Sequence, residues 1–190
     1  MYNITLNGES YVRFPSNPKL YEKSNLFISL DVDKLDWNGL SGNTEATDII
    51  NAEYKSNPNS TKIDWCWLLR NPAAIDIIKA ELKSNLNSTK INWYGICENK
   101  AAIDIIKAEL KSNPNSTKID WYHLCKNKAA IDIIKTELKS NPDSTKIYNR
   151  EYLWANPAAT DIIKTEYKLN PNSTEISWFY LSQNPAAIDI

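Results

Sequence analysis

The sequence predicts an all-α fold, an α-solenoid of about six helix-turn-helix repeats of 28 to 29 residues. Tryptophan recurs at a spacing of 28 residues, at Trp37, Trp65, Trp93 and Trp121. A fixed period of this length is typical of stacked repeat architectures. Each period holds one longer and one shorter stretch with helix start signals, and neither can bury its apolar side alone. Stacked copies would cover these sides, which is how a solenoid builds a continuous core.

The longer predicted helix follows the motif "NPAAIDIIKAELKS", residues 71 to 84. Asn71 suits the N-cap position, and Pro72 suits the first helical position. The apolar residues that follow share one face at helical spacing; in this copy they are Ala74, Ile75, Ile78 and Leu82. We expect the helix to end near Ser84, because most copies continue with Asn-Pro and the residue before a proline avoids helical geometry.

An aspartate recurs in the first turn of each longer helix, on its polar side. These aspartates are Asp76, Asp104, Asp132 and Asp161. We interpret them as solvated residues that form salt bridges with the lysine three positions later. Their repetition once per copy argues against a pair of catalytic carboxylates.

The shorter predicted helix starts at the tryptophan of each repeat. In five of six copies the preceding residue can accept hydrogen bonds from the first free amides of a helix. The residues at this cap position are Asp36, Asp64, Asn92, Asp120, Tyr148 and Ser177. Apolar residues before and after the cap, such as Ile63 and Leu68, form a predicted hydrophobic staple. We expect the tryptophan to pack between repeats, because large aromatic rings dominate core packing.

The repeat changes register once. The next tryptophan position holds Asn149, one extra residue enters within "YNREYLWANPAA", and the pattern resumes at Trp178, 29 residues later. Trp154 is a candidate to replace the missing ring. The sequence stops at Ile190, inside another "NPAAIDI". We therefore expect the last repeat to be incomplete, and its end to be continued by further chain or covered by a partner, because soluble solenoids normally close with a polar repeat.

Residues 1 to 30 do not match the repeat and form a predicted N-terminal cap or arm, ahead of an α-helical repeat domain at residues 31 to 190. The stretch "YNITLNGESYVRF" alternates partly between apolar and polar residues, and Asn7-Gly8 is a two-residue hairpin signal. A small β-hairpin that caps the solenoid and an irregular arm both remain open.

Charge and composition argue against several classes of protein. Twenty-two basic and 23 acidic residues leave a net charge of -1, so no sequence-wide basic field would attract a nucleic acid. No stretch approaches the roughly 18 apolar residues that a membrane helix needs, and the first residues do not resemble a signal peptide. We expect an intracellular protein without a nucleic-acid partner and without membrane insertion.

The sequence offers few candidates for chemistry, so we predict no enzyme, no cofactor and no metal site. His123 is the only histidine, and a general base needs partners that hold and tune it. Cys66, Cys97 and Cys125 form no C-x-x-C pair, and we interpret them as reduced packing cysteines. An enzyme, the least favoured alternative, would need a site built from residues that differ between copies, such as His123, Cys125 and Arg150.

Five Asn-x-Ser/Thr triplets are formal glycosylation acceptors. They begin at Asn3, Asn59, Asn87, Asn115 and Asn172. Because no secretory signal precedes them, we interpret them as turn sequences in which Asn, Ser and Thr side chains bond to the nearby backbone.

The copies "KIDWCWLLRNPAAIDII" and "EISWFYLSQNPAAIDI" share Trp, then Leu, then Asn-Pro-x-Ala-Ile. Residues 31 to 190 thereby resemble the short Trp and Asn-Pro repeat proteins of large (giant) DNA viruses of amoebae and algae, although these units are longer. The resemblance implies a helical repeat protein of viral origin. It is compatible with a minor capsid or other virion component, located in the virion or the host cytoplasm, with capsid proteins or neighbouring copies at the C-terminal end as partners.

The middle of the shorter helix varies between copies inside a constant frame, as in "CWLLR", "YGICE", "YHLCK" and "FYLSQ". Positions required for stacking should stay constant, so the variable ones are candidates for binding. The candidate partner surface is a discontinuous aromatic row of Trp67, Tyr94, Tyr122, His123, Phe179 and Tyr180; packing against the next repeat is the alternative. The favoured function is a structural or protein-protein interaction scaffold, with an adaptor for a host protein as the alternative.

Overall fold

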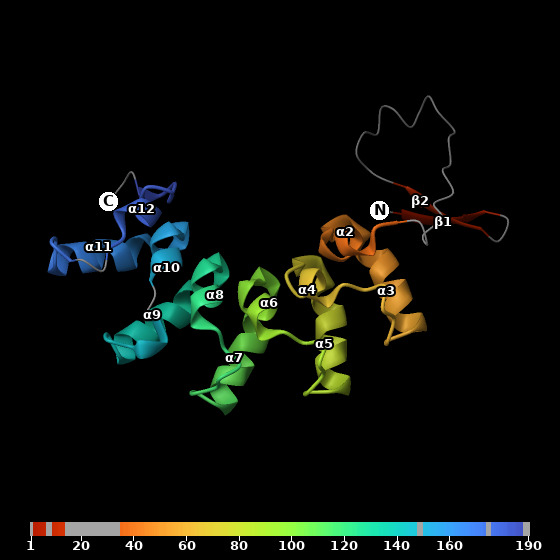
Figure 1. The fold of residues 1–190 in the computed structure, drawn as a ribbon, viewed down its shortest axis with the longest axis horizontal. Helices are drawn as coiled ribbons and strands as arrows, with labels where there is room; N and C mark the ends of the chain where they lie inside the picture. Colours follow the sequence, from red (N-terminus) through yellow and green to blue (C-terminus); the bar gives the residue numbers. More distant parts are fainter. Residues whose placement is uncertain (1, 7–8, 14–34, 148–149, 174–175, 188–190) are drawn as a thin grey trace, which may run out of the picture. The chain divides into compact units, whose positions relative to one another are not determined.

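The computed structural model describes residues 2–6, 9–13, 35–147, 150–173 and 176–187 (Figure 1). The chain divides into two compact units, residues 1–77 and 78–190, and the boundary falls within one of the longer helices. Within the part of the chain that the structure describes, no helix is long and apolar enough to cross a membrane.

The helices alternate between shorter and longer throughout the repeat region, which confirms the predicted α-helical repeat fold. The shorter helices are α2 (Trp37–Gly42), α4 (Trp65–Leu68), α6 (Trp93–Glu98), α8 (Trp121–Lys126), α10 (Glu151–Ala155) and α12 (Trp178–Leu181). The longer helices are α3 (Thr47–Ser56), α5 (Ile75–Ser84), α7 (Ile103–Ser112), α9 (Ile131–Ser140) and α11 (Thr160–Leu169). Within the second unit, α8 packs between α6 and α10, and α10 packs against α12.

A β-hairpin precedes the repeats. Strand β1 (Tyr2–Leu6) pairs antiparallel with β2 (Glu9–Arg13), and Leu6 lies opposite Glu9. This pairing confirms the predicted β-hairpin, while its role as a cap of the solenoid stays a prediction. The predicted turn residues Asn7 and Gly8 themselves lie outside the described residues.

Each longer helix is entered through a three-residue 3₁₀ turn. These turns are η2 (Thr44–Ala46), η3 (Pro72–Ala74), η4 (Lys100–Ala102), η5 (Lys128–Ala130) and η7 (Pro157–Ala159), while η6 (Thr145–Ile147) precedes the inserted residue. Asn71 caps η3 as predicted, because its side-chain oxygen accepts a hydrogen bond from the Ala73 amide. The copies with lysine in place of proline keep this cap: the Asn127 oxygen accepts from the Ala129 amide.

Four of the five longer helices end at the serine of the motif, α11 ends at Leu169 in the same position, and a proline is not needed to end them. The amide of Asn113, before Pro114, donates to the Glu109 carbonyl, and the next residue continues into a turn. Asn85 makes the same bond to the Glu81 carbonyl although Leu86 follows it. Its side-chain oxygen also accepts from the Asn87 amide at 3.0 Å. The asparagine therefore forms the stop. The predicted turn chemistry is confirmed for the serine of the Asn-x-Ser/Thr triplet, because Ser88 Oγ accepts a hydrogen bond from the Lys90 amide at 3.3 Å.

The shorter helices have the predicted caps in their first four copies. Asp36, Asp64, Asn92 and Asp120 each accept a hydrogen bond from an amide of the first turn. The prediction is wrong for Ser177, whose side chain makes no cap bond. Tyr148 lies outside the described residues, and α10 begins after Arg150, which makes no side-chain cap bond either.

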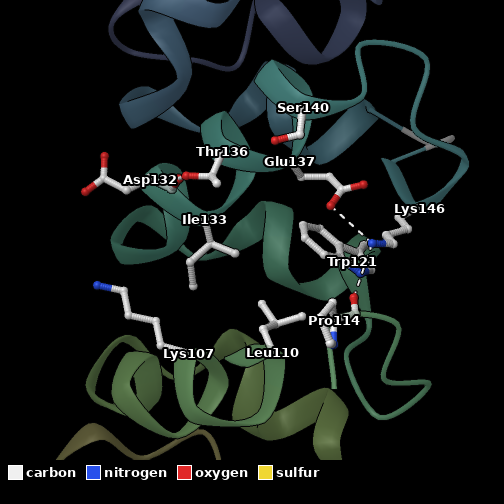
Figure 2. A pocket seen from close by; sticks show the side chains of 10 residues that line it. All are labelled: Lys107, Leu110, Pro114, Trp121, Asp132, Ile133, Thr136, Glu137, Ser140 and Lys146. Atoms are coloured by element: carbon white, nitrogen blue, oxygen red, sulfur yellow. Dashed lines mark hydrogen bonds and ion pairs between the residues drawn. The ribbon is translucent and has the colours of Figure 1, made fainter. Parts of the chain in front are cut away.

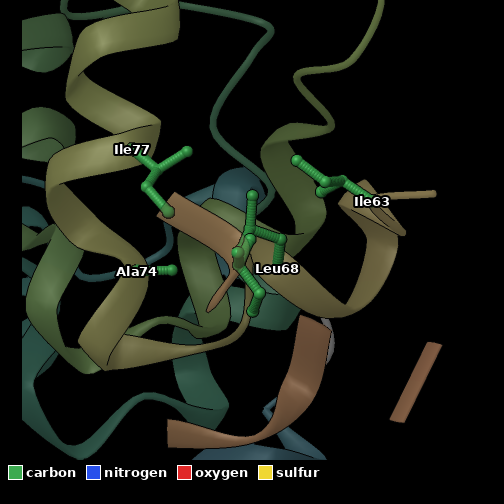
Figure 3. Close-up of a cluster of buried hydrophobic side chains, with 5 residues drawn as sticks. Ile63, Leu68, Ala74 and Ile77 are labelled. Carbon is green, nitrogen blue, oxygen red and sulfur yellow. The ribbon is translucent and has the colours of Figure 1, made fainter. Parts of the chain in front are cut away.

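The core lies between the shorter and the longer helices of each repeat. In the first unit, Ile63, Leu68, Ala74 and Ile77 point toward one another (Figure 3), and Ile50 completes the cluster. Burial of a Leu or Ile side chain contributes about 1.5–3 kcal/mol. Ile63 precedes the Asp64 cap and Leu68 follows it by four residues, and both belong to this cluster. This confirms the predicted hydrophobic staple.

The repeated tryptophans are the first residues of their shorter helices. Among Trp37, Trp65, Trp93, Trp121 and Trp178, only Trp121 is buried. Trp65 packs edge-on against Tyr54 at the end of the preceding longer helix, with ring centroids 5.9 Å apart. A lysine ammonium from the following loop covers other rings; the pairs are Lys62 over Trp37, Lys118 over Trp93 and Lys146 over Trp121. Trp178 is 59% exposed, but its ring also packs edge-on against Tyr167 of the preceding longer helix, with ring centroids 6.0 Å apart.

Two further expectations are corrected. Trp154 occupies the position of Cys125, not that of the missing ring, because its carbonyl accepts from Asn184 as the Cys125 carbonyl accepts from Asn156. Among the described residues, no ion pair joins a first-turn aspartate to the lysine three positions later. The ion pair that does form links adjacent longer helices, from Lys135 to Asp161 at 2.8 Å.

Candidate protein-binding surface

Buried asparagines hold consecutive shorter helices in register. The side-chain amide of Asn127 donates to the carbonyls of Cys97 at 2.9 Å and Asn99 at 3.1 Å, at the end of α6. Asn184 bridges to Trp154 and Asn156 in the same way. The positions of α6, α8, α10 and α12 are therefore tied by bonds between repeats, since each asparagine belongs to the loop that follows one shorter helix.

Six rings on these four helices form a continuous aromatic row. Its members in order of contact are Tyr94, His123, Tyr122, Tyr152, Tyr180 and Phe179. The centroids of neighbouring rings lie between 4.6 and 5.8 Å apart. The Tyr94 and His123 rings stack at an interplanar angle of 24°, whereas the remaining contacts are edge-to-face. Such contacts lie within the 4.5–7 Å range that aromatic pairs favour.

The row is most exposed at its two ends. Tyr94 is 50% exposed and Phe179 is 69% exposed, while the rings between them are partly buried by their neighbours. Lys126 lies over the middle of the row, with its ammonium 4.2 Å from the Tyr152 ring centroid. The same ammonium pairs with Glu98 at 3.1 Å. A charged pair therefore flanks the apolar rings.

Two phenol groups of the row hold their protons more tightly than a free tyrosine. A hydrogen bond with Tyr152, followed by burial, raises the pKa of Tyr122 to about 12. Burial and the nearby Glu151 carboxylate raise the pKa of Tyr180. The Tyr122 and Tyr180 side chains therefore stay uncharged at neutral pH and keep their hydroxyl groups as hydrogen-bond donors.

His123 is positioned by two carboxylates. Its amide donates to Asp120 Oδ1 at 2.8 Å, and its Nδ1 lies 2.9 Å from the same oxygen. Its Nε2 lies 3.8 Å from Glu98 Oε1. These contacts hold the ring against Tyr94.

The structure brings five of the six predicted surface residues into one row, and the row is continuous where a discontinuous one was expected. Trp67, the sixth, is 54% exposed and belongs to the first unit. Tyr152 was missed by the sequence reasoning, yet it links Tyr122 to Tyr180. Tyr152 is equivalent to His123 when the inserted residue before α10 is treated as a gap in the alignment of the repeats. An alignment of the repeats with this gap would have identified Tyr152.

The three cysteines differ in their exposure to solvent. Cys97 and Cys125 are buried, whereas Cys66 is exposed, which corrects the packing role expected for it. Burial raises the pKa of the Cys125 thiol to about 12 although Arg150 acts in the opposite direction. The thiolate is the reactive form, so Cys125 stays protonated at neutral pH. In the described part of the chain, no group of three or more His, Cys, Asp or Glu side chains could hold a metal ion.

Comparison with known protein families, with curated proteins and with solved structures finds no match for this chain.

Proposed function

We propose that this chain is a non-enzymatic α-helical repeat protein that binds a protein partner through the aromatic row of its second unit. The observation that carries the proposal is the row itself: six rings from four helices, in unbroken contact. Tyrosine and phenylalanine are enriched in the cores of protein interfaces, and charged groups lie at their rims. Lys126 and Glu98 supply charges of this kind beside the rings.

The exposure of the terminal rings supports binding over a purely structural role. Stacking between repeats is provided by buried residues such as Leu124 and Asn127. Tyr94 and Phe179 leave half or more of their surface in solvent, where they add little to the core. Exposed aromatic anchors beside partly buried ones are the arrangement from which binding hot spots are built.

The experiment is affinity capture from the cells in which the protein is naturally made. The bait variant carries Tyr94→Ser and Phe179→Ser, and the matched control carries Tyr167→Ser and Leu169→Ser, which remove exposed apolar groups on α11 outside the row. We expect the row variant to recover a specific partner at least about tenfold less than the unchanged protein, because anchor residues contribute 1–2 kcal/mol or more each. We expect the control to recover it normally.

The identity of the captured protein decides between narrower versions of the proposal. The resemblance to repeat proteins of large DNA viruses supports a place in the virus particle, for which coat proteins are the expected partners. An adaptor would instead recover one host protein. Equal recovery of every protein by the row variant and the unchanged protein would refute binding through the row.

A further inference from the structure

A groove of about 450 Å³ lies between the consecutive longer helices α7 and α9 (Figure 2). It belongs to the second unit, and none of the rings of the aromatic row lines it. Its floor is apolar, with Leu110 from α7 and Ile133 from α9 pointing into it, and the Trp121 ring lying beside them. Pockets of 300–1,000 Å³ with apolar walls and a few polar groups are typical binding sites.

One end of the groove is closed by a fixed group of contacts. The Lys146 ammonium donates to Glu137 Oε2 at 3.1 Å and to the Pro114 carbonyl at 3.3 Å. The same ammonium lies 5.6 Å from the Trp121 ring centroid. Because the charges of Lys146 and Glu137 neutralise each other, they close this end of the groove without attracting a charged ligand. The apolar floor is then the surface that a ligand would contact there.

The other end is open between two charges of opposite sign. Lys107 stands on the α7 side and Asp132 on the α9 side. In the next pair of longer helices, the equivalent residues Lys135 and Asp161 form an ion pair at 2.8 Å. Among the residues that the structure describes, Lys107 and Asp132 have no ion-pair partner. Within the described part of the chain, the ion pair that links α9 to α11 therefore has no counterpart between α7 and α9. The charges of Lys107 and Asp132 at the mouth of the groove are thus available to a ligand.

We infer that this groove is a second protein-binding site, which takes a short peptide segment with a large apolar side chain between an acidic and a basic residue. The apolar side chain would lie on Leu110, Ile133 and Trp121. The acidic residue of the segment would pair with Lys107, and the basic residue would pair with Asp132. Placement of opposite charges at the mouth gives selectivity against segments whose two flanking charges are alike. The inference stands independently of the aromatic row.

Three capped pentapeptides test this assignment: Gly-Asp-Trp-Lys-Gly, Gly-Asp-Trp-Asp-Gly and Gly-Lys-Trp-Lys-Gly. Binding is followed by the methyl NMR signals of Leu110 and Ile133 during titration. We expect the mixed peptide to shift both signals with a Kd of about 1 mM, and the like-charged peptides to bind at least about threefold more weakly.

Charge variants at the mouth should change which peptide is preferred. Lys107→Glu should favour the dibasic peptide, and Asp132→Lys should favour the diacidic one. Lys164→Glu is the matched control, because it changes the net charge as Lys107→Glu does but lies at the equivalent, exposed position of α11. It should leave the preference for the mixed peptide unchanged. Lys107, Asp132 and Lys164 are all exposed, so these substitutions should not unfold the protein.

The assignment is overturned if none of the peptides shifts the Leu110 and Ile133 signals at concentrations up to about 10 mM. It is equally overturned if Lys164→Glu alters the preference as much as Lys107→Glu does, since the effect would then come from net charge alone. Selective shifts that follow the two mouth variants support it, whatever the outcome of the capture experiment on the aromatic row.

Discussion

The side chain of Asn127 makes three hydrogen bonds in a site that is only 3% exposed. Its oxygen accepts from the Ala129 amide, and its amide group donates to the Cys97 and Asn99 carbonyls of the preceding repeat. Asn127→Asp keeps the acceptor but replaces both donors by a charged oxygen facing two carbonyls. We expect a loss of about 3–5 kcal/mol in the free energy of unfolding, because each buried carbonyl left unpaired costs about 1–3 kcal/mol. Urea denaturation measures this loss.

Asn113→Asp is the control for this prediction. Asn113 is exposed, and its side-chain oxygen accepts from the Asn115 amide, which an aspartate can also do. We expect a change below about 1 kcal/mol, the usual size of a charge effect at a helix end. If the two variants were equally stable, the bridge between repeats would not hold the stack together.

The three cysteines should differ sharply in reactivity. Burial raises the pKa of the Cys97 and Cys125 thiols to about 12, whereas Cys66 is exposed. We expect a thiol reagent at pH 8 to modify Cys66 in the folded protein and the other two only after denaturation, because the thiolate is the reactive form. Mass spectrometry of the modified peptides over time checks this. Modification of all three at one rate in the folded protein would contradict the burial described above.

At the scale of the element, the loop after α5 offers a stabilising substitution. Asn85 makes the same backbone bonds as the asparagines that precede prolines, but Leu86 follows it and is 72% exposed. Leu86→Pro should raise the free energy of unfolding by about 0.4–1 kcal/mol, because proline restricts the unfolded chain where the native backbone already suits it. Thermal denaturation provides the measurement, and a lower melting temperature would show that this loop differs from its copies.

The shorter helices should lose stability in alkaline solution. The folded protein raises the pKa of Tyr122, Cys97 and Cys125 to about 12, above ordinary values of 10 for tyrosine and 9 for cysteine. The folded state therefore favours the protonated forms. The contribution of these three protonated groups to the free energy of unfolding is fully present below about pH 9 and is lost as the pH rises toward 12. We expect the urea midpoint to fall between pH 8 and pH 11.

Tyr152→Phe is the variant that separates the tyrosine contribution from the cysteine one. It removes the hydrogen bond that is the main cause of the raised pKa of Tyr122. The fall in the urea midpoint between pH 8 and pH 11 should be smaller in this variant than in the unchanged protein. An equal fall in both would assign the alkaline effect to other groups.

The elements could be predicted because their signals are local. Asp64 stands directly before its helix and Ile63 directly before the cap, so both roles follow from adjacent residues. The second role of Asn71 could not be predicted, because its carbonyl partners at Ser41 and Asn43 lie 30 and 28 residues earlier. Which carbonyls face the asparagine depends on how the repeats stack, and no local signal carries that information.

At the scale of the whole molecule, the sequence predicts that aromatic residues form the candidate surface. It does not predict that their rings are in unbroken contact. Variation at the middle of the shorter helices indicated Tyr94, Tyr122 and His123. The inserted residue before α10 displaced Tyr152 from the expected position, so the ring that joins the two halves of the row was missed. The groove between α7 and α9 was missed as well, because it depends on a lysine and an aspartate whose distance only the packing sets.

Site-specific photo-crosslinking in the cells that make the protein tests the central claim most directly, that the repeats present the aromatic row to a protein partner. A photoreactive phenylalanine analogue replaces Tyr94 or Phe179 at the two exposed ends of the row, or Lys139 on the exposed side of α9 as the control. We predict that one and the same protein is crosslinked from both ends of the row and not from position 139. Absence of any adduct at the row, or an adduct from position 139 alone, would contradict the claim.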